Sequence, residues 1–287
     1  MSVVTTILSI QSSVAYGHVG NSAATFPLMR MGVEVWPVLT VHFSNHTGYP
    51  HWRGPLLSAD DVAEVIRGID ERGVLGRCDA VLSGYQGGDD VGAVILDAVA
   101  LVRSRNPQAI YCCDPVLGDV GRGMYVRPGI PELMRDRVIR EAQIITPNQF
   151  ELEFLTGRST TTMPEVLAAA DAARTRGPEI VLVTSVVHTD ADPDTIDMVA
   201  VSGDGAWAVR TPLLGRTFTG AGDLTAATFL ASYLRSGDVA DAVARTAAVV
   251  YGVLAVTVAT GESELQLVAA QDEIAQPTRT FEARKLR

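Results

Sequence analysis

The sequence almost lacks lysine: among its 287 residues the only one is Lys285, in the polar C-terminal tail. It contains no phosphate-binding loop of the GxxxxGK[ST] type and no strand lysine of the protein-kinase type. The same scarcity argues against an enzyme that holds a cofactor through a Schiff-base lysine. Any phosphate chemistry in this chain must therefore use backbone amides, arginine and a metal ion.

Cysteine is also scarce, and the three thiols Cys78, Cys112 and Cys113 cannot build a disulfide framework. Cys112 and Cys113 lie in an apolar, strand-like run, so we expect buried, reduced thiols and a cytoplasmic protein. The N-terminus shows neither a basic segment nor a small-residue cleavage site, and we expect no signal peptide.

Basic charge is in the minority, with 23 Lys and Arg against 33 Asp and Glu and a net charge of −10. Such a chain has no electrostatic reason to bind nucleic acid or an anionic membrane. The longest uncharged run, residues 246–261, is too short for a membrane span, and we expect a buried core helix there. A hydrophobic content of 47% indicates a globular protein with a large core.

Short apolar, β-branched runs alternate with segments of helical periodicity. Strands are expected at Val3–Ile10, Val33–Phe43, Ala80–Leu82, Ala109–Cys113, Gln143–Ile145 and Ile180–Val183, and a hairpin at Asp197–Val201 and Trp207–Arg210. Helices are expected at Val19–Met31, from Ser58 to about Arg72, at Gly92–Ser104, at Pro164–Arg176 and through the last third. Ser58 and Asp61 fit a capping box, and Gly177 is expected to cap the helix before it. This alternation predicts an α/β fold, with a mostly parallel sheet covered by helices on both faces, in a single domain over 1–287.

Polar residues follow each expected strand, where ligands of such sheets bind. They are Gln11, Ser12, Ser13 and Gly17; residues 44–48; residues 83–85; Asp114; Thr146, Asn148 and Glu151; and Thr184 and Ser185. Each alone is explained as a cap or turn residue. Together on one edge of the sheet they predict a binding site.

The turn Gly220-Ala221-Gly222-Asp223 opens an Ala-rich apolar run, which predicts a helix start. The amides of a first helical turn and the helix dipole form an anion site, and glycine lets a ligand approach the backbone. Asp223 would place a carboxylate beside that site, as a base in phosphoryl transfer requires. The alternative is an ordinary helix start at which Asp223 only satisfies backbone donors.

Several blocks of the chain resemble pyridoxal kinases of the ribokinase superfamily. They are SIQSSVAYGHVGNSAATFPL (9–28), TVHFSNHTGY (40–49), SGY (83–85), CDPVLGD (113–119), TPNQFELEFLTG (146–157) and GAGD (220–223). The resemblance spans the whole chain and implies a three-layer ribokinase-like fold. It also implies ATP-dependent phosphorylation of the 5′-hydroxymethyl group of pyridoxal, in vitamin B6 salvage, by a homodimer.

The resemblance implies a role for each matching position. Asp223 matches the catalytic base, and the amides of Gly220, Ala221 and Gly222 match an anion hole for the transferred phosphoryl group. The positions that match the pocket of the pyridine ring are Ser12, Val19, Val41, Phe43, His46, Thr47, Gly48 and Tyr85. Among these, His46 matches a contact near the 4′ aldehyde.

The nucleotide side is implied in the same way. Asp114 and Glu151 match an acidic pair near the phosphates of Mg·ATP, where Mg²⁺ prefers carboxylate, water and phosphate oxygens. Thr146 and Thr184 match positions around the phosphates and a monovalent cation such as K⁺. Residues 118–127 match a glycine-rich lid, from which Arg122 would reach phosphate unless it is simply solvated.

The chain departs from the family at two places. Ala221 stands where Thr or Val is usual, which keeps the backbone amide and removes a hydroxyl or branched wall. The nucleotide-side segment Thr211, Pro212, Leu213 and Leu214 begins with Thr where many relatives have Arg, and Arg216 lies nearby.

Two other functions stay open at this point. One is a hydroxymethylpyrimidine kinase, against which the block at residues 40–49 argues; the other is a non-catalytic vitamin-binding protein, for which Asp114, Glu151 and Asp223 would not all be needed.

Three further motifs are weaker. The histidines at 42, 46 and 51 lack HExxH spacing, the aspartates at 190, 192 and 194 lack the glycine and glutamate of a calcium loop, and Gly17-x-x-Gly20 is not a dinucleotide fingerprint.

Overall fold

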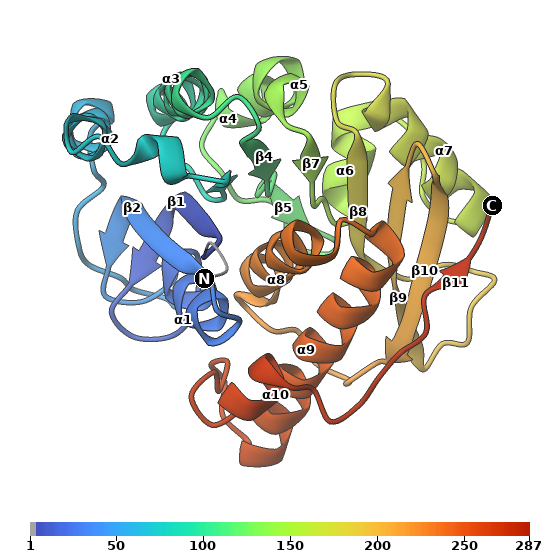
Figure 1. Cartoon of the computed structure of the whole chain (residues 1–287). Helices are drawn as coiled ribbons and strands as arrows, with labels where there is room; N and C mark the ends of the chain where they lie inside the picture. The colour runs from blue at the N-terminus through green and yellow to red at the C-terminus, as the bar shows by residue number, and fades with distance from the viewer. Residues whose placement is uncertain (1–3) are drawn as a thin grey trace.

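The computed structural model describes residues 4–287 and is built around one large sheet (Figure 1). The strands of that sheet are β1 (Thr6–Val14), β2 (Glu34–Phe43), β3 (Ala80–Ser83), β4 (Ile110–Cys113), β7 (Ile144–Ile145), β8 (Ile180–Val186), β9 (Thr195–Ser202), β10 (Gly205–Pro212) and β11 (Arg284–Lys285). A separate two-stranded hairpin joins β5 (Gly118–Asp119) to β6 (Gly123–Met124). Val3, the predicted start of the first strand, lies outside the described residues.

The sheet has the strand order β11-β10-β9-β8-β7-β4-β3-β1-β2. The pairs from β2 across to β8 are parallel, whereas β9, β10 and β11 are added antiparallel at one edge. The predicted hairpin is confirmed, because Ser202 of β9 pairs with Gly205 of β10. The carboxyl ends of the parallel strands consequently meet along one edge, where the site is expected.

Helices cover both faces of the sheet. One face carries α2 (Ala59–Glu71), α3 (Asp89–Arg105), α4 (Ile130–Leu133), α5 (Ile139–Glu141), α6 (Gln149–Thr156) and α7 (Met163–Arg174), with a 3₁₀ turn at Leu75–Arg77 and a π-helical turn at Met134–Val138. The other face carries α1 (Asn21–Arg30), α8 (Ala221–Ser236) and α9 (Val239–Thr260), and α10 (Gln271–Ala275) packs against α9 and α1.

The alternation of side chains along each strand divides the core between these two layers. In β8, Val181 and Val183 pack in the first layer, and Ile180 and Leu182 pack in the second. Strands buried on both faces need continuous apolar sequence, which explains the uninterrupted Val and Ile runs. The predicted α/β class with helices on both faces is confirmed.

Helix α9 alone among residues 4–287 is long and apolar enough to cross a membrane by length and composition. In the structure 61% of its most apolar stretch is buried against protein. It packs on α8, α10, β9 and β10, as the predicted core helix should.

Local sequence explains where several helices begin. The predicted capping box at Ser58 is present, since its side chain accepts the Asp61 N–H and the Asp61 carboxylate accepts the Ser58 N–H. The predicted cap at Gly177 is wrong, because α7 ends at Arg174. A Cβ at Gly177 would lie 2.5 Å from the Arg140 carbonyl, so glycine serves a close backbone passage there.

Two strands, β1 and β8, run past the polar residues that were expected to follow them, and both are irregular at the site edge. Residues 11–13 belong to β1, whose register with β2 shifts between Gln11 and Ser13. Thr184 and Ser185 belong to β8, whose register with β9 shifts between Val183 and Val186. Bulges of this kind redirect side chains without ending a strand, which is why polar residues did not mark the strand ends.

Two valines of α2 test which face of this helix packs in the core. Val62 is 1% exposed and Val65 is 51% exposed. We expect Val62→Ala to lower the free energy of unfolding by about 2–3 kcal/mol, from two lost methyl groups and the cavity they leave. Val65→Ala should change it by less than about 0.5 kcal/mol. Urea unfolding measures both, and equal effects would contradict the assigned packing.

Candidate functional site

A cavity of about 630 Å³ opens at the carboxyl ends of the parallel strands. Every residue that the resemblance assigned to catalysis, the ring pocket, the nucleotide or the metal lines it, from Ser12 on β1 to Asp223 on α8. Of the polar residues at the predicted strand ends, Gln11, Ser13, Gly17, Ser44, Asn45, Ser83 and Gly84 do not line it. The predicted ring-pocket residues gather beside β1 and β2, and the predicted nucleotide residues gather beside β7, β8 and β10. The fold thus brings both groups into one continuous space, with the start of α8 on its wall.

Helix α8 begins at the glycine turn. Its N-cap is Gly220, with a φ of 87° and no side-chain cap. A Cβ at Gly220 would lie 1.8 Å from the carbonyl oxygen of His18, so only glycine fits. The first-turn amides have no helical acceptor by geometry, although the Ala221 N–H donates to the Phe218 carbonyl at 3.3 Å. The turn therefore presents a positive helix end to the cavity.

Asp223 lies in the first turn of α8 and does not cap it. Burial raises the pKa of its carboxyl group to about 6, against the opposing effect of backbone N–H groups that include Gly20. The residue lines the cavity, in the part where α8 begins. A carboxylate with a pKa near neutrality can both accept and return a proton, which the alternative of a simple helix cap would not require.

A second acidic centre lies beside the first turn of α8, where a Cβ at Gly222 would be 3.9 Å from Asp114 Oδ2. Asp114, directly after β4, accepts the Thr146 hydroxyl at 2.9 Å. Glu151, in the first turn of α6, accepts the backbone N–H groups of Leu117 and Asn148 at 2.9 Å each. Both residues are about 95% buried, and within residues 4–287 neither forms an ion pair.

The pKa values of this pair show the cost of that burial. Burial first, and the charge of Asp223 second, raise the pKa of Asp114 to about 8. Burial and the charge of Asp114 raise the pKa of Glu151 well above its usual range. Two close carboxylates without a neutralising cation favour binding of one. With only two carboxylates available, the remaining ligands of a hard cation would be water and phosphate oxygens.

The ring-pocket side is formed by β1, β2 and the loop after β2. Val41 is buried at the end of β2, and the Thr40 hydroxyl donates to the Tyr85 carbonyl at 2.7 Å. Burial raises the pKa of the Tyr85 hydroxyl, as expected for a largely covered phenol. Apolar and aromatic walls with few polar groups suit a planar heterocycle.

His46 lines this pocket with both ring nitrogens already engaged. Its Nε2 is 3.0 Å from Glu264 Oε1, and its Nδ1 accepts the Gly48 N–H at 3.1 Å. A hydrogen bond from His46 to a ligand must therefore replace one of these two. The Tyr49 hydroxyl also donates to Glu264, at 2.7 Å.

Sequence reasoning missed Glu264 and Tyr49. Glu264 is separated from His46 by 218 residues, and no local pattern marks such a contact. The other histidines of that segment do not gather with His46, and residues 4–287 contain no group of three His, Cys, Asp or Glu side chains that could hold a metal.

The nucleotide side ends in the hairpin β5–β6 and the bulge of β8. The Asn148 side chain donates to the Gly118 carbonyl and to the Asp119 carboxylate, which ties the hairpin to the start of α6. Arg122 lies in this hairpin, 5.2 Å from the centre of the Tyr125 ring, and lines the cavity. Ser185 has a φ of 55°, the one positive value outside glycine in residues 4–287. Such strain is typical of functional edges.

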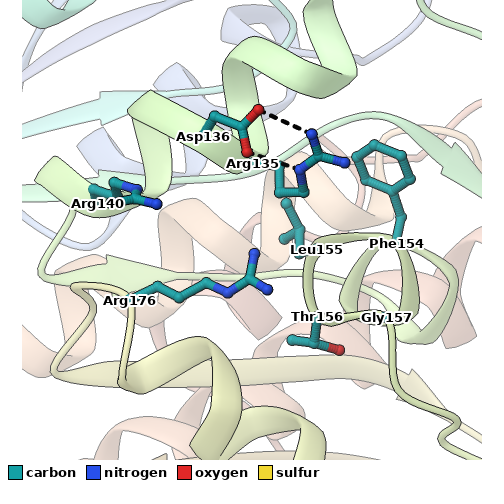
Figure 2. A pocket seen from close by; sticks show the side chains of 8 residues that line it. All are labelled: Arg135, Asp136, Arg140, Phe154, Leu155, Thr156, Gly157 and Arg176. Atoms are coloured by element: carbon teal, nitrogen blue, oxygen red, sulfur yellow. Dashed lines mark hydrogen bonds and ion pairs between the residues drawn. The ribbon is translucent and has the colours of Figure 1, made fainter.

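A second cavity of about 550 Å³ lies far from this chemistry (Figure 2). It is lined by Arg135, Asp136, Arg140, Phe154, Leu155, Thr156, Gly157 and Arg176. Helix α6 starts beside the acidic pair and ends at this second cavity, so the two lie at opposite ends of the helix. No predicted site residue lines it.

Comparison with known proteins places the chain among small-molecule kinases. A family model described as phosphomethylpyrimidine kinase matches residues 90–267. Pyridoxal kinase PdxY of Rubrobacter xylanophilus is 57% identical over 98% of this chain and 97% of its own length. Pyridoxal kinase PdxY of Leifsonia xyli subsp. xyli is 56% identical over 96% and 97%. The structure of pyridoxal kinase from Leishmania donovani in complex with ADP and pyridoxamine matches with a TM-score of 0.93 at 28% identity, covering 99% of this chain and 100% of that one.

The acidic pair should lower stability when no cation is bound. The raised pKa of Asp114, about 8 against an ordinary 3.8, means that the folded chain keeps a proton the unfolded chain has lost. Stability contributed by this group therefore falls as pH rises between these two values. In EDTA we expect Asp114→Asn to melt at least about 2 °C above the unsubstituted protein at about pH 8, with a smaller gain at about pH 5.

Thermal unfolding with and without Mg²⁺ checks this expectation. Mg²⁺ should raise the melting temperature of the unsubstituted protein and leave that of Asp114→Asn nearly unchanged. Asp97→Asn, at an exposed position of α3, is the matched control and should give a small offset that does not depend on pH. A lower melting temperature for Asp114→Asn at pH 8 in EDTA would contradict the assigned charge strain.

Proposed function

Because the chain belongs to the pyridoxal kinase family and has its ribokinase-like fold, we propose that it transfers the γ-phosphoryl group of ATP to the 5′-hydroxymethyl group of pyridoxal. One observation carries this proposal. A carboxylate with a pKa of about 6, Asp223, stands at a glycine-turn helix start between an apolar ring pocket and a buried acidic pair. Phosphoryl transfer from a metal-bound triphosphate to a hydroxyl group on a planar ring needs this arrangement.

The assigned chemistry follows from the geometry. Asp223 accepts the proton of the attacking hydroxyl as that oxygen meets the γ-phosphorus in line. The first-turn amides of α8 stabilise the charge on the transferred group, since fixed dipoles need no reorganisation during the reaction. Arg122 of the hairpin β5–β6 lies where it can neutralise phosphate charge. Ser12 and Thr47 hold the polar edge of the ring, and Val19, Val41, Phe43 and Tyr85 cover its faces.

Asp114 and Glu151 would hold Mg²⁺, which when bound neutralises the phosphate oxygens of ATP. Their fit rests on the donor set: two buried carboxylates with raised pKa values and no cationic partner in residues 4–287. Thr146 and Thr184 would face the phosphates and a K⁺ ion, and the segment Thr211, Pro212, Leu213 and Leu214 would face the nucleotide. For this chain we also propose a single kinase domain, a homodimer and a cytoplasmic location; the buried, reduced thiols support the location.

A hydroxymethylpyrimidine kinase is the second candidate, and the family model matched by residues 90–267 favours it. That match leaves out the ring-pocket segments on β1 and after β2. The relatives that align with those segments as well are pyridoxal kinases. A non-catalytic vitamin-binding protein is the third candidate. Binding alone would not require three buried carboxylates, which lower the stability of the fold.

The assigned base is tested by Asp223→Asn. Loss of a general base should lower kcat/KM for pyridoxal by about 10²–10⁴-fold, while pyridoxal affinity stays within about threefold. ADP release with Mg·ATP and each candidate alcohol gives the rates, and calorimetry gives the affinity. Full activity of Asp223→Asn would rule out the assigned base. Faster turnover of hydroxymethylpyrimidine, or tight pyridoxal binding without turnover of any B6 form, would support the second or third candidate.

The pH dependence supplies an independent check. A base works only when deprotonated, so kcat/KM should fall about tenfold per pH unit below the pKa of Asp223, about 6, and level off above it. Ser12→Ala should raise KM for pyridoxal and leave that midpoint in place, because burial and backbone N–H groups, and not the Ser12 side chain, set the pKa of Asp223. A midpoint that moves with Ser12→Ala, or rates that rise toward acid, would argue against this assignment.

A further inference from the structure

Glu264 is a buried carboxylate in the segment between α9 and α10, and the proposed phosphoryl transfer does not use it. It is 7% exposed. Its two oxygens accept hydrogen bonds from His46, Tyr49 and the backbone of His18, which belong to two other parts of the chain. Within residues 4–287 no Arg or Lys pairs with it, and its basic neighbour is the imidazole of His46. Burying a carboxylate without Arg or Lys costs free energy of desolvation, which several hydrogen-bond donors must offset. We therefore expect this carboxylate to have a structural or functional role.

The first contact determines the state of His46. Since Nδ1 accepts the Gly48 N–H at 3.1 Å, it carries a lone pair, and the ring proton is on Nε2. That proton is donated to Glu264 Oε1 at 3.0 Å. The Tyr49 ring packs 4.6 Å from the imidazole and sends its hydroxyl to the same oxygen. Glu264 and the Gly48 N–H together therefore fix the tautomer of a side chain that lines the ring pocket, and Glu264 with Tyr49 holds its orientation.

The second oxygen faces the segment from Gly17 to Gly20. It accepts the His18 N–H at 3.2 Å, and a Cβ at Gly17 would lie 2.1 Å from it, so glycine makes room for the carboxylate. The His18 carbonyl packs directly on Gly220 at the start of α8. Two residues later the Gly20 N–H lies close enough to the Asp223 carboxylate to lower its pKa.

We propose that Glu264 is a positioning residue that holds the ring-pocket loop and the Gly17–Gly20 segment in a fixed relation to Asp223. This inference rests on the proposed function for its kinetic part, and on the contacts alone for its structural part. One carboxylate thereby sets the distance between the wall of the vitamin pocket and the base that deprotonates the vitamin.

The test compares Glu264→Ala, Glu264→Gln and the neighbouring Glu262→Ala, whose side chain is exposed. Loss of hydrogen bonds to a buried charge should raise KM for pyridoxal about tenfold to hundredfold in Glu264→Ala. KM for ATP should stay within about twofold, because no contact of Glu264 reaches the nucleotide side. Glu264→Gln keeps one oxygen for His46 and Tyr49 and should recover most of the loss. Glu262→Ala should match the unsubstituted enzyme.

A spectroscopic readout separates positioning from general stability. In ¹⁵N-histidine-labelled protein without ligand, His46, assigned with His46→Asn, should show a protonated Nε2 and an unprotonated Nδ1. Glu264→Ala should lose this single tautomer, and Glu264→Gln should keep it. Where Glu264→Ala does not fold, Tyr49→Phe and Glu264→Gln carry the comparison, with a smaller rise in KM for pyridoxal expected in each.

The outcomes distinguish this inference from the proposed function. An unchanged tautomer in a folded Glu264→Ala, or equal rises in KM for pyridoxal and ATP, would overturn the positioning role. A changed tautomer in a chain that phosphorylates no B6 vitamer would support the positioning role and overturn the proposed function instead.

Discussion

Uncompensated negative charge at the carboxyl edge of the sheet is the constraint on which the rest of the structure depends. Asp114, Glu151 and Asp223 face one cavity, and burial raises the pKa of each. A chain whose only lysine is near its C-terminus supplies no fixed ammonium partner there. Backbone N–H groups, one hydroxyl and partial protonation of the carboxyl groups reduce the repulsion at this edge without removing it. The edge therefore favours a ligand that brings positive charge.

Local backbone chemistry makes that compromise possible. Asn148 and Glu151 form the capping box that starts α6. The hydrogen bond from the Asn148 N–H to Glu151 holds this carboxylate in place in the lining of the cavity. Because capping already holds Glu151 in place, its orientation costs little extra when a cation binds. The bulges in β2 and β8 act similarly: Thr40 and Val41 of β2 oppose the single Ser12 of β1, and Thr184 and Ser185 of β8 oppose one residue of β9. Ser12 and Thr184 line the cavity at these points while the strands continue.

Sequence patterns predicted the parts of this site that depend on local chemistry. Asp114 and Glu151 follow apolar, strand-like runs, Asp223 follows a glycine turn, and each lines the cavity. The roles of these residues remain predictions. Patterns failed where tertiary contact decides: β1 absorbs Ser12 because pairing with β2 continues past it, and Gly177 marks a backbone crossing instead of a helix end. Glu264 had no local pattern at all, because its partners are brought to it by the fold.

The position of Asp223 links these levels. Burial alone would raise its pKa above the value of about 6, and the Gly20 N–H opposes that shift. Gly20 holds its place because the neighbouring His18 is fixed twice, by its N–H on Glu264 and by its carbonyl against Gly220. Any other residue at Gly220 would collide with that carbonyl and move the segment whose Gly20 N–H lowers the pKa of the base. The glycine turn thus matters for the acidity of Asp223 as well as for room at the phosphate, which the motif alone does not reveal.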